Sequence, residues 1–206
     1  MAHYKNGNFQ GRIGNRVYYR LNGKTVVRSV GRTEKAPSLK QLTCRQRLKV
    51  LNTFFKSIKA FLNVGFALQQ KGTSKSAYSE AMGHNLERAT TGEYPDVVLN
   101  YANVRVSRGK LLPPLDSSVA QEAAGLRFSW SMLEVDYQNR YDAAMVLIYF
   151  PENGAALCLL NAAQRQTGEV FVPLDAAQLQ MEKQLYLAFA AEGRNGLSDS
   201  IYLGKL

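Results

Sequence analysis

At 206 residues, 46% of them hydrophobic and 20% charged, the chain is long enough to bury a core, and this composition excludes a disordered tail. Its net charge of +10 is unevenly distributed. The first 79 residues carry nine Lys and seven Arg against one acid, Glu34, a net charge of +15. Residues 80–112 are balanced, and residues 113–206 hold six basic against eleven acidic residues, a net charge of −5. Charge sorted in this way predicts two bodies with different partners.

The N-terminal residues 1–5 lack the apolar core of a secretory signal, and the longest apolar runs, such as 144–150, are too short to span a bilayer. We therefore expect a cytoplasmic chain, free or associated with a particle, with no membrane span. Cys44 and Cys158 lie in different halves of the chain, with no metal-ligand spacing around them. We expect two buried thiols, and neither a disulfide framework nor a zinc site.

The first element in chain order is a β-hairpin. Two β-rich runs, 16–21 and 24–30, flank Asn22-Gly23, and Asn-Gly favours a two-residue type I′ turn because both positions need a positive φ angle. Such a turn fixes the pairing of the strands: Leu21 with Lys24, Tyr19 with Val26, and Val17 with Arg28. Since neither face of this hairpin is wholly apolar, we expect the rest of its domain to cover one of them.

A long helix is predicted next. Residues 37–41 have a helix-start pattern, with Ser38 as N-cap and Gln41 at the capping-box position. Apolar residues recur on one helix face, at Cys44, Leu48, Leu51, Phe55, Ile58 and Leu62. A basic stripe lies across the helix, with Arg45, Lys49, Asn52, Lys56 and Lys59. A shorter helix over 76–90 and two short strands, 97–101 and 104–107, follow, and we expect these strands to join the hairpin in a small sheet.

Residues 112–115, Leu-Pro-Pro-Leu, are the best domain boundary, because paired prolines end regular structure and the charge changes sign there. Beyond it, strand patterns recur at the short intervals typical of a β-sandwich: 126–130, 144–150, 155–160, 169–173, 184–191 and 200–203. The chain is therefore predicted to have a basic α+β domain over 1–112, with a small antiparallel sheet and two helices, followed by an all-β sandwich over 113–206. We expect Trp130, Tyr149 and Tyr186 in the sandwich core, and exposed carbohydrate-binding rings are the alternative.

The C-terminal segment resembles a fibronectin type III domain, an immunoglobulin-like sandwich. Residues 128–130, Phe-Ser-Trp, are similar to the Trp strand of that family, and residues 185–197, with Asp199 beyond them, are similar to its Tyr strand, glycine turn and final strand. The resemblance implies a fold for residues 113–206 and is almost silent on function.

The whole chain also resembles an uncharacterised bacterial family, a domain of unknown function. Its members pair a Gly-x-x-Gly-Asn start and a hairpin ending in Val-Val-Arg-Ser with a Gln-rich basic helix, and here these features are residues 11–15, 26–29 and 41–46. Residues 91–95 and 107–109 fit the same pattern. This resemblance supports the two-part architecture and implies no activity.

The sequence does not favour catalysis. His3 is near the N-terminus, and His84 is on the shorter helix without a partner at ligand spacing, which is typical of a surface or packing residue. No nucleophile elbow, Walker loop, zinc-protease motif or dinucleotide fingerprint occurs. We expect no enzyme activity, no cofactor, no metal and no small-molecule substrate.

Residues 11–14, Gly-Arg-Ile-Gly, match the Gly-x-x-Gly loop with which KH domains clamp a nucleic-acid backbone, but that loop joins two helices. Because the flanks here are β-like, a glycine turn or bulge is the favoured interpretation.

The basic stripe of the long helix places like charges one turn apart, which costs roughly a few tenths of a kcal/mol per close pair unless an anion neutralises them. Three interpretations stay open: a solvated face, docking of the acidic C-terminal domain, and binding of nucleic acid, an anionic polymer or an acidic partner. Tyr18 and Tyr19 among the hairpin arginines are compatible with base stacking, although such aromatics more often pack across strands. The candidate binding residues are Arg12, Arg16, Arg20, Arg28, Arg45, Lys49, Lys56 and Lys59.

The function predicted from the sequence is that of a non-catalytic binding or assembly protein. In this hypothesis the sandwich is an interaction module, and the basic part engages an acidic partner protein or another copy of the chain. The alternative is a nucleic-acid-binding protein that uses the basic N-terminal domain.

Overall fold

The computed structural model describes residues 3–5, 8–21, 23–31, 35–133 and 135–206. The chain divides into two units, Met1–Ser38 and Leu39–Leu206. The predicted boundary after residue 112 does not coincide with this division, because helices before it and strands after it share one hydrophobic core. No helix in the described ranges is both long and apolar enough to cross a bilayer.

The first unit is a small antiparallel sheet. Its strands pair in sequence order and are β1 (His3–Lys5), β2 (Asn8–Ile13), β3 (Arg16–Leu21) and β4 (Lys24–Ser29). The predicted hairpin register is confirmed: Leu21 lies opposite Lys24, Tyr19 opposite Val26, and Val17 opposite Arg28.

Glycines lie in the turn between β2 and β3 and in the turn between β3 and β4. Gly23, between β3 and β4, has a φ of 78°, as an Asn-Gly turn requires, whereas Asn22 lies outside the described residues. Gly14, with a φ of 55°, lies in the turn between β2 and β3. The Gly-x-x-Gly motif therefore belongs to a strand and its turn, not to the junction of two helices that a KH loop needs.

The second unit begins with a layer of helices, α1 (Leu39–Ser57), α2 (Lys59–Gly65) and α3 (Ala77–Asn85). Helix α1 begins directly after Ser38, as the sequence predicts. The side chain of Ser76 caps α3, since its hydroxyl accepts a hydrogen bond from the backbone N–H of Ser79 (3.2 Å).

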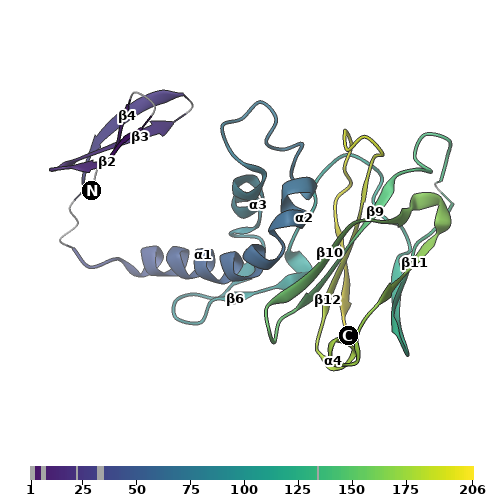
Figure 1. The fold of residues 1–206 in the computed structure, drawn as a ribbon. Helices are drawn as coiled ribbons and strands as arrows, with labels where there is room; N and C mark the ends of the chain where they lie inside the picture. Colours follow the sequence, from purple (N-terminus) through teal and green to yellow (C-terminus); the bar gives the residue numbers. More distant parts are fainter. Residues whose placement is uncertain (1–2, 6–7, 22, 32–34, 134) are drawn as a thin grey trace. The chain divides into compact units, whose positions relative to one another are not determined.

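Only the second half of the predicted apolar stripe on these helices is buried. Leu51, Phe55 and Leu62 are fully buried, but Leu48 is 39% exposed and Cys44 is exposed. The expectation that Cys44 is buried is wrong, because the N-terminal half of α1 extends away from α2 and α3 (Figure 1). Cys158, by contrast, is half-buried.

The short strands predicted between residues 97 and 107 do not join the hairpin. Strand β6 (Val98–Leu99) pairs with β5 (Thr90–Thr91) in a two-stranded sheet of the second unit, and a short 3-10 helix, η1 (Tyr101–Asn103), follows. Residues 104–107 belong to no strand. They form an extended segment instead, and their alternating pattern arises because the side chains of Val104 and Val106 are buried in the core.

The rest of the second unit contains two facing antiparallel sheets, with strand orders β10-β9-β12-β13 and β11-β8-β7. Their elements are β7 (Ser118–Glu122), β8 (Gly125–Ser129), β9 (Ala143–Phe150), β10 (Ala155–Gln164), η2 (Arg165–Thr167), β11 (Glu169–Pro173), α4 (Ala176–Gln180), β12 (Gln184–Ala190) and β13 (Ile201–Lys205). The strand predictions over 126–203 are confirmed, whereas β7 and α4 were not predicted.

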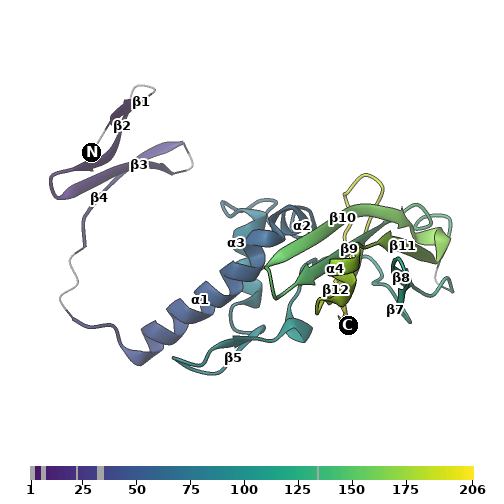
Figure 2. The same cartoon turned by 60° about the horizontal axis from the view of Figure 1, so that its bottom comes forward.

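The four-stranded sheet is covered on both faces. On one face Tyr149 and Tyr186 pack against the helices, with the Tyr149 and Phe54 ring centroids 4.5 Å apart. On the other face Val146 and Phe189 pack in a core with Phe128 of the three-stranded sheet. The second unit is thus a mixed α+β fold of three layers: helices, the four-stranded sheet and the three-stranded sheet (Figures 1 and 2).

Candidate partner-binding surface

The basic residues predicted as a binding surface fall in both units. Arg12, Arg16, Arg20 and Arg28 belong to the first unit, and Arg45, Lys49, Lys56 and Lys59 belong to the second. All of these side chains are exposed.

The four arginines of the first unit do not share a face of its sheet. Val17 lies opposite both Arg12 and Arg28, so these three residues project from one face. Arg16 and Arg20 alternate with Val17 along β3 and project from the other face. The guanidinium groups of Arg12 and Arg20 also donate hydrogen bonds to carbonyl oxygens of the adjacent turns, at 2.9 and 3.0 Å. The sheet therefore presents a few cations on each face instead of one basic face.

Arg45 and Lys49 are brought together on the second unit, where both line a groove of about 520 Å³ beside α1. Their spacing of four residues places them on one side of the helix. The other lining residues of this α1 groove are Leu42, Gln46, Val50, Thr53, Tyr94 and Pro95. No acidic residue among the described ones lines it, whereas Glu87 and Glu93 line a second groove along the same helix. Lys56 and Lys59 lie outside the α1 groove.

The loop between β5 and β6 forms the wall of the α1 groove opposite the helix. The side-chain amide of Gln46 donates a hydrogen bond to the carbonyl oxygen of Pro95, and the backbone N–H of Tyr94 donates to the hydroxyl of Thr43 (3.2 Å). These bonds hold the loop on α1 and leave the Tyr94 ring 46% exposed. The groove therefore has a fixed wall with an accessible aromatic ring beside two cations.

The basic stripe is not neutralised within the second unit. Among the residues that the structure describes, no ion pair involves Arg45, Lys49, Lys56 or Lys59. The acidic sandwich packs on α1 through Phe54 and leaves the stripe exposed. The described residues thus show no acidic side chain paired with the stripe, and an external anion would relieve the repulsion between Arg45 and Lys49.

Tyr94 and Pro95 were missed by the sequence reasoning. The run Thr-Gly-Glu-Tyr-Pro at 91–95 predicts the end of a helix, and no local pattern links it to a helix so much earlier in the chain. Two signals could have drawn attention to this segment: an aromatic residue directly before a proline in a loop, and the fit of residues 91–95 to the family pattern.

The remaining candidate side chains are packing residues. Trp130, Tyr149 and Tyr186 are buried, so none of them offers a ring to a carbohydrate. Trp130 lies in the sandwich core as predicted, whereas Tyr149 and Tyr186 lie on the other face of the four-stranded sheet, in the core shared with the helices. His84, on α3, lies next to Phe66, with ring centroids 6.2 Å apart, while the side chain of His3 lies outside the described residues. Within the described ranges, no three His, Cys, Asp or Glu side chains are grouped so that they could hold a metal ion.

Acid should destabilise the protein in part through His84. Burial lowers the pKa of this imidazole below its usual 6.5, and the positive charge of Arg108 lowers the pKa further. Because the folded-state pKa is the lower one, the unfolded state binds the proton first, and stability is lost as pH falls below 6.5 and through the folded-state pKa. His84→Gln should therefore lose less free energy of unfolding than the wild type over this range, as measured by urea unfolding at each pH. If the free energy of unfolding fell equally in both proteins as pH is lowered, the folded state would not be holding the His84 imidazole neutral.

Comparison with known proteins gives a family and no relative of known activity. Searches of curated proteins and of solved structures each give no match. A family model matches residues 8–204, and this range includes both the Gly-x-x-Gly-Asn start and the basic helix that carry the resemblance seen in the sequence. The chain belongs to DUF6266, a family of unknown function.

Proposed function

We propose that this protein is a non-catalytic binding or assembly protein that holds an acidic segment of a partner protein, or of another copy of the chain, in the α1 groove. The observation that carries the proposal is the unpaired Arg45 and Lys49 beside the exposed ring of Tyr94. A cytoplasmic or particle-associated location is part of the same proposal.

The composition of the α1 groove supports an acidic protein segment as its occupant. Arg45 and Lys49 attract carboxylates, and an occupant that supplies two of them relieves the repulsion between the two cations. Leu42, Val50 and Pro95 add apolar contact area between these charges. Aromatic and arginine side chains around an apolar floor are typical of protein interfaces.

We also infer that the two facing sheets form a fibronectin type III-like sandwich. The division into a four-stranded and a three-stranded antiparallel sheet and the burial of Trp130 between them support this assignment. The helices cover the outer face of the four-stranded sheet. A sandwich of this kind can serve as an interaction module only through its loops or through its three-stranded sheet.

A nucleic-acid-binding protein is the second candidate. Its support is the first unit, where exposed Arg16 and Arg20 flank the half-buried ring of Tyr18 on one face of the sheet. Exposed cations beside aromatic rings suit phosphate contact and base stacking. Arg12 and Arg28 on the other face would extend such contacts around the unit.

Charge reversal in the α1 groove should abolish binding of an acidic peptide. The probes are a fluorescein-labelled peptide that alternates Glu with Leu and a labelled mixed-sequence single-stranded DNA, each titrated with the full-length protein over a salt series. The double variant Arg45→Glu/Lys49→Glu should weaken peptide binding by more than about tenfold, or roughly 1.4 kcal/mol. Tyr94→Ala should weaken peptide binding without any change in net charge.

The matched control is Lys56→Glu/Lys59→Glu, which changes the net charge by the same amount outside the groove. It should leave the peptide affinity within about threefold of the wild-type value, a difference of well under 1 kcal/mol. Equal losses in both double variants, or no peptide binding at low salt, would contradict the proposal. Tight DNA binding that falls steeply with salt and depends on Arg16 and Arg20 would favour the nucleic-acid alternative instead.

A further inference from the structure

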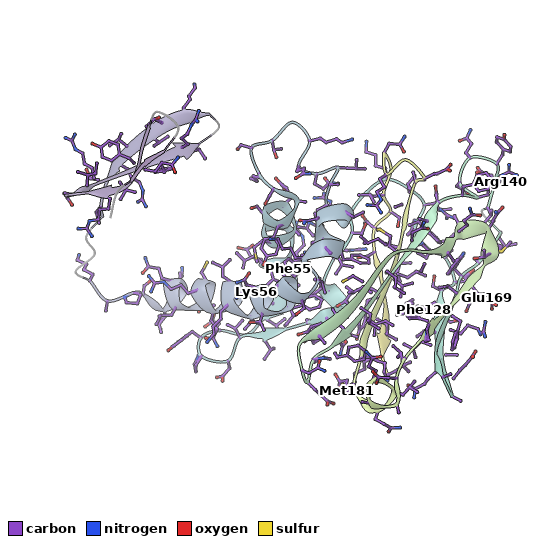
Figure 3. The ribbon with its side chains drawn as sticks, in the orientation of Figure 1. Phe55, Lys56, Phe128, Arg140, Glu169 and Met181 are labelled. Carbon is purple, nitrogen blue, oxygen red and sulfur yellow. The ribbon has the colours of Figure 1, made fainter. Side chains whose placement is uncertain are left out.

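The loop between β8 and β9, described over residues 130–133 and 135–142, exposes a group of large apolar side chains at one end of the sandwich. Leu133 is 90% exposed, Tyr137 80%, Met132 49% and Tyr141 42%. Single exposed apolar residues are ordinary on protein surfaces, but several of them on one short loop indicate an interaction site. Figure 3 shows Arg140 on this loop, at the end of the sandwich opposite Met181.

The β8–β9 loop is anchored at both of its ends. The backbone N–H of Ser131 donates a hydrogen bond to the carbonyl oxygen of Leu115, and that of Gln166 donates to the carbonyl oxygen of Arg140, at 2.9 and 3.0 Å. Between these anchors, a carboxylate oxygen of Asp136 accepts two backbone N–H bonds of the loop, each of 2.8 Å. Such anchoring lowers the entropy that the loop would lose on binding.

Arg140 is held between the two tyrosines of the loop. Its guanidinium carbon lies 4.4 Å from the centroid of the Tyr137 ring and 4.6 Å from that of the Tyr141 ring. Cation–π contacts of this kind fix the plane of the guanidinium group and cover its faces. Stacking leaves the edge of the guanidinium group, through which an arginine donates two parallel hydrogen bonds to a carboxylate.

Among the described residues, Arg140 has no carboxylate partner, unlike the other stacked arginines. Arg127 lies over the ring of Phe171 and pairs with Glu122 and Glu169. Arg165 lies over the ring of Phe189 and pairs with Asp142. In the part of the chain that the structure describes, the side chain of Arg140 has no ion pair and no hydrogen bond, and its Nε is buried without a partner.

We propose that the β8–β9 loop is a second binding surface, in which Arg140 takes a carboxylate of a protein segment whose apolar side chains pack on Tyr137 and Leu133. A protein fits better than a nucleic acid because residues 113–206 carry a net charge of −5, which repels the many phosphates of a nucleic acid more strongly than a single carboxylate on an otherwise apolar segment. The exposed Leu133 and Met132 also contribute nothing to phosphate recognition, whereas apolar contact suits a protein partner. This surface is separate from the α1 groove, and the proposal does not depend on that groove.

A peptide array tests the proposal with the full-length protein. Each peptide carries one Glu or Asp among Leu, Val and Phe, and its twin carries Gln or Asn in place of the acid. The wild type should bind the acidic peptides at least about tenfold more tightly than their amide twins, and Arg140→Gln should remove this difference in the Arg45→Glu/Lys49→Glu background, where the α1 groove no longer contributes to it. Tyr137→Ala should weaken binding of the acidic peptides by about tenfold, because the guanidinium loses one stacking partner.

Two controls separate this surface from other cationic sites. Arg194→Gln removes an exposed cation from the neighbouring loop between β12 and β13 and should leave the preference for acidic peptides unchanged. Arg45→Glu/Lys49→Glu removes the cations of the α1 groove and should still retain a preference for acidic peptides that depends on Arg140, so that failure of the α1 groove proposal and failure of this one are distinguishable. The inference is overturned if acidic and amide peptides bind equally, if the preference survives Arg140→Gln in the Arg45→Glu/Lys49→Glu background, or if it disappears in either control.

Discussion

Gly65→Ala is expected to destabilise the second unit by about 3 kcal/mol, although it adds a single methyl group. Gly65 ends α2, and a Cβ atom placed there would lie 2.2 Å from the carbonyl oxygen of Val106 and 3.0 Å from the Cα of Ser107. Both neighbours are backbone atoms, so the added methyl group must push residues 104–108 away from the helix. That shift would break the 2.9 Å hydrogen bond from the backbone N–H of Arg108 to the carbonyl oxygen of Gly65.

Urea unfolding followed by circular dichroism and by fluorescence measures this loss. The single tryptophan of the chain, Trp130, is buried between the two sheets and reports on the sandwich, while circular dichroism reports on the helices. Because the helices and the four-stranded sheet share a core, both signals should shift to lower urea concentration together. An early loss of helical signal alone would show that the helical layer unfolds independently.

Gly83→Ala is the matched control for Gly65→Ala. Gly83 is also helical, but it is exposed on α3, and an added Cβ atom would meet nothing within 4 Å outside the backbone of its own helix. Alanine has the higher helix propensity and restricts the unfolded chain, so Gly83→Ala should raise the free energy of unfolding by roughly 0.5–1 kcal/mol. Effects of the same sign at the two positions would contradict the close approach of α2 to residues 106–107.

The elements that could be predicted from the sequence are those with a local signal. Asn22-Gly23 sets the register of the hairpin because a two-residue turn leaves one way to pair the strands. Strand β7 was missed because its residues are mostly exposed and lack apolar alternation. Helix α4 was missed although Asp175 and Gln178 carry a capping-box spacing, and the structure contains that capping box. A search for capping-box residues that also accepts sites with no apolar helical pattern after them could have predicted α4.

The assembly of the layers could not be predicted in the same way. Every residue from Ala144 to Phe150 is buried, and a strand that is apolar on both faces indicates a sheet covered on both sides. The sequence does not say that α1 and α2 supply one of the covers, because that choice depends on contacts between residues distant in the chain. The predicted boundary at residue 112 failed for this reason.

The candidate site was predicted in part. Arg45 and Lys49 follow from the helical spacing of charges, and this pairing on one face of α1 could be read from the sequence. Tyr94 reaches the same groove only through the folded position of the β5–β6 loop. Arg140 was not among the residues predicted to bind a partner. An unpaired arginine indicates a binding site only through its surroundings, and the stacking and exposure of its two tyrosine neighbours are known only from the structure.

Arg165→Met is expected to be the most destabilising change considered, with a loss of roughly 3–5 kcal/mol at neutral pH. The Arg165 and Asp142 side chains are only 3% and 5% exposed, and an Nη of Arg165 lies 3.4 Å from a carboxylate oxygen of Asp142. The same guanidinium group donates a hydrogen bond of 3.1 Å to the carbonyl oxygen of Leu112 and stacks on the ring of Phe189. Methionine keeps much of the apolar volume of the arginine side chain, so the loss of stability comes chiefly from the Asp142 carboxylate, which is left without its cation. Urea unfolding followed by circular dichroism measures it, since Trp130 is too close to Arg165 for its fluorescence to be an independent probe.

The pH dependence of that loss separates a charge effect from a packing effect. Burial raises the pKa of the Asp142 carboxyl above 3.8, and Arg165 opposes this rise, so the variant should have a still higher pKa at this position. A carboxyl whose folded-state pKa is raised contributes stability below the unfolded value of 3.8, and that stability is lost as pH rises through the folded-state pKa. The deficit of Arg165→Met relative to the wild type should therefore shrink as pH falls toward 3.8.

The double variant Arg165→Met/Asp142→Asn removes both charges and should recover most of the stability at neutral pH, because replacing a buried pair is far less costly than breaking it. A deficit independent of pH and undiminished in the double variant would mean that Arg165 stabilises the fold through its contacts with Leu112 and Phe189 and not through its charge.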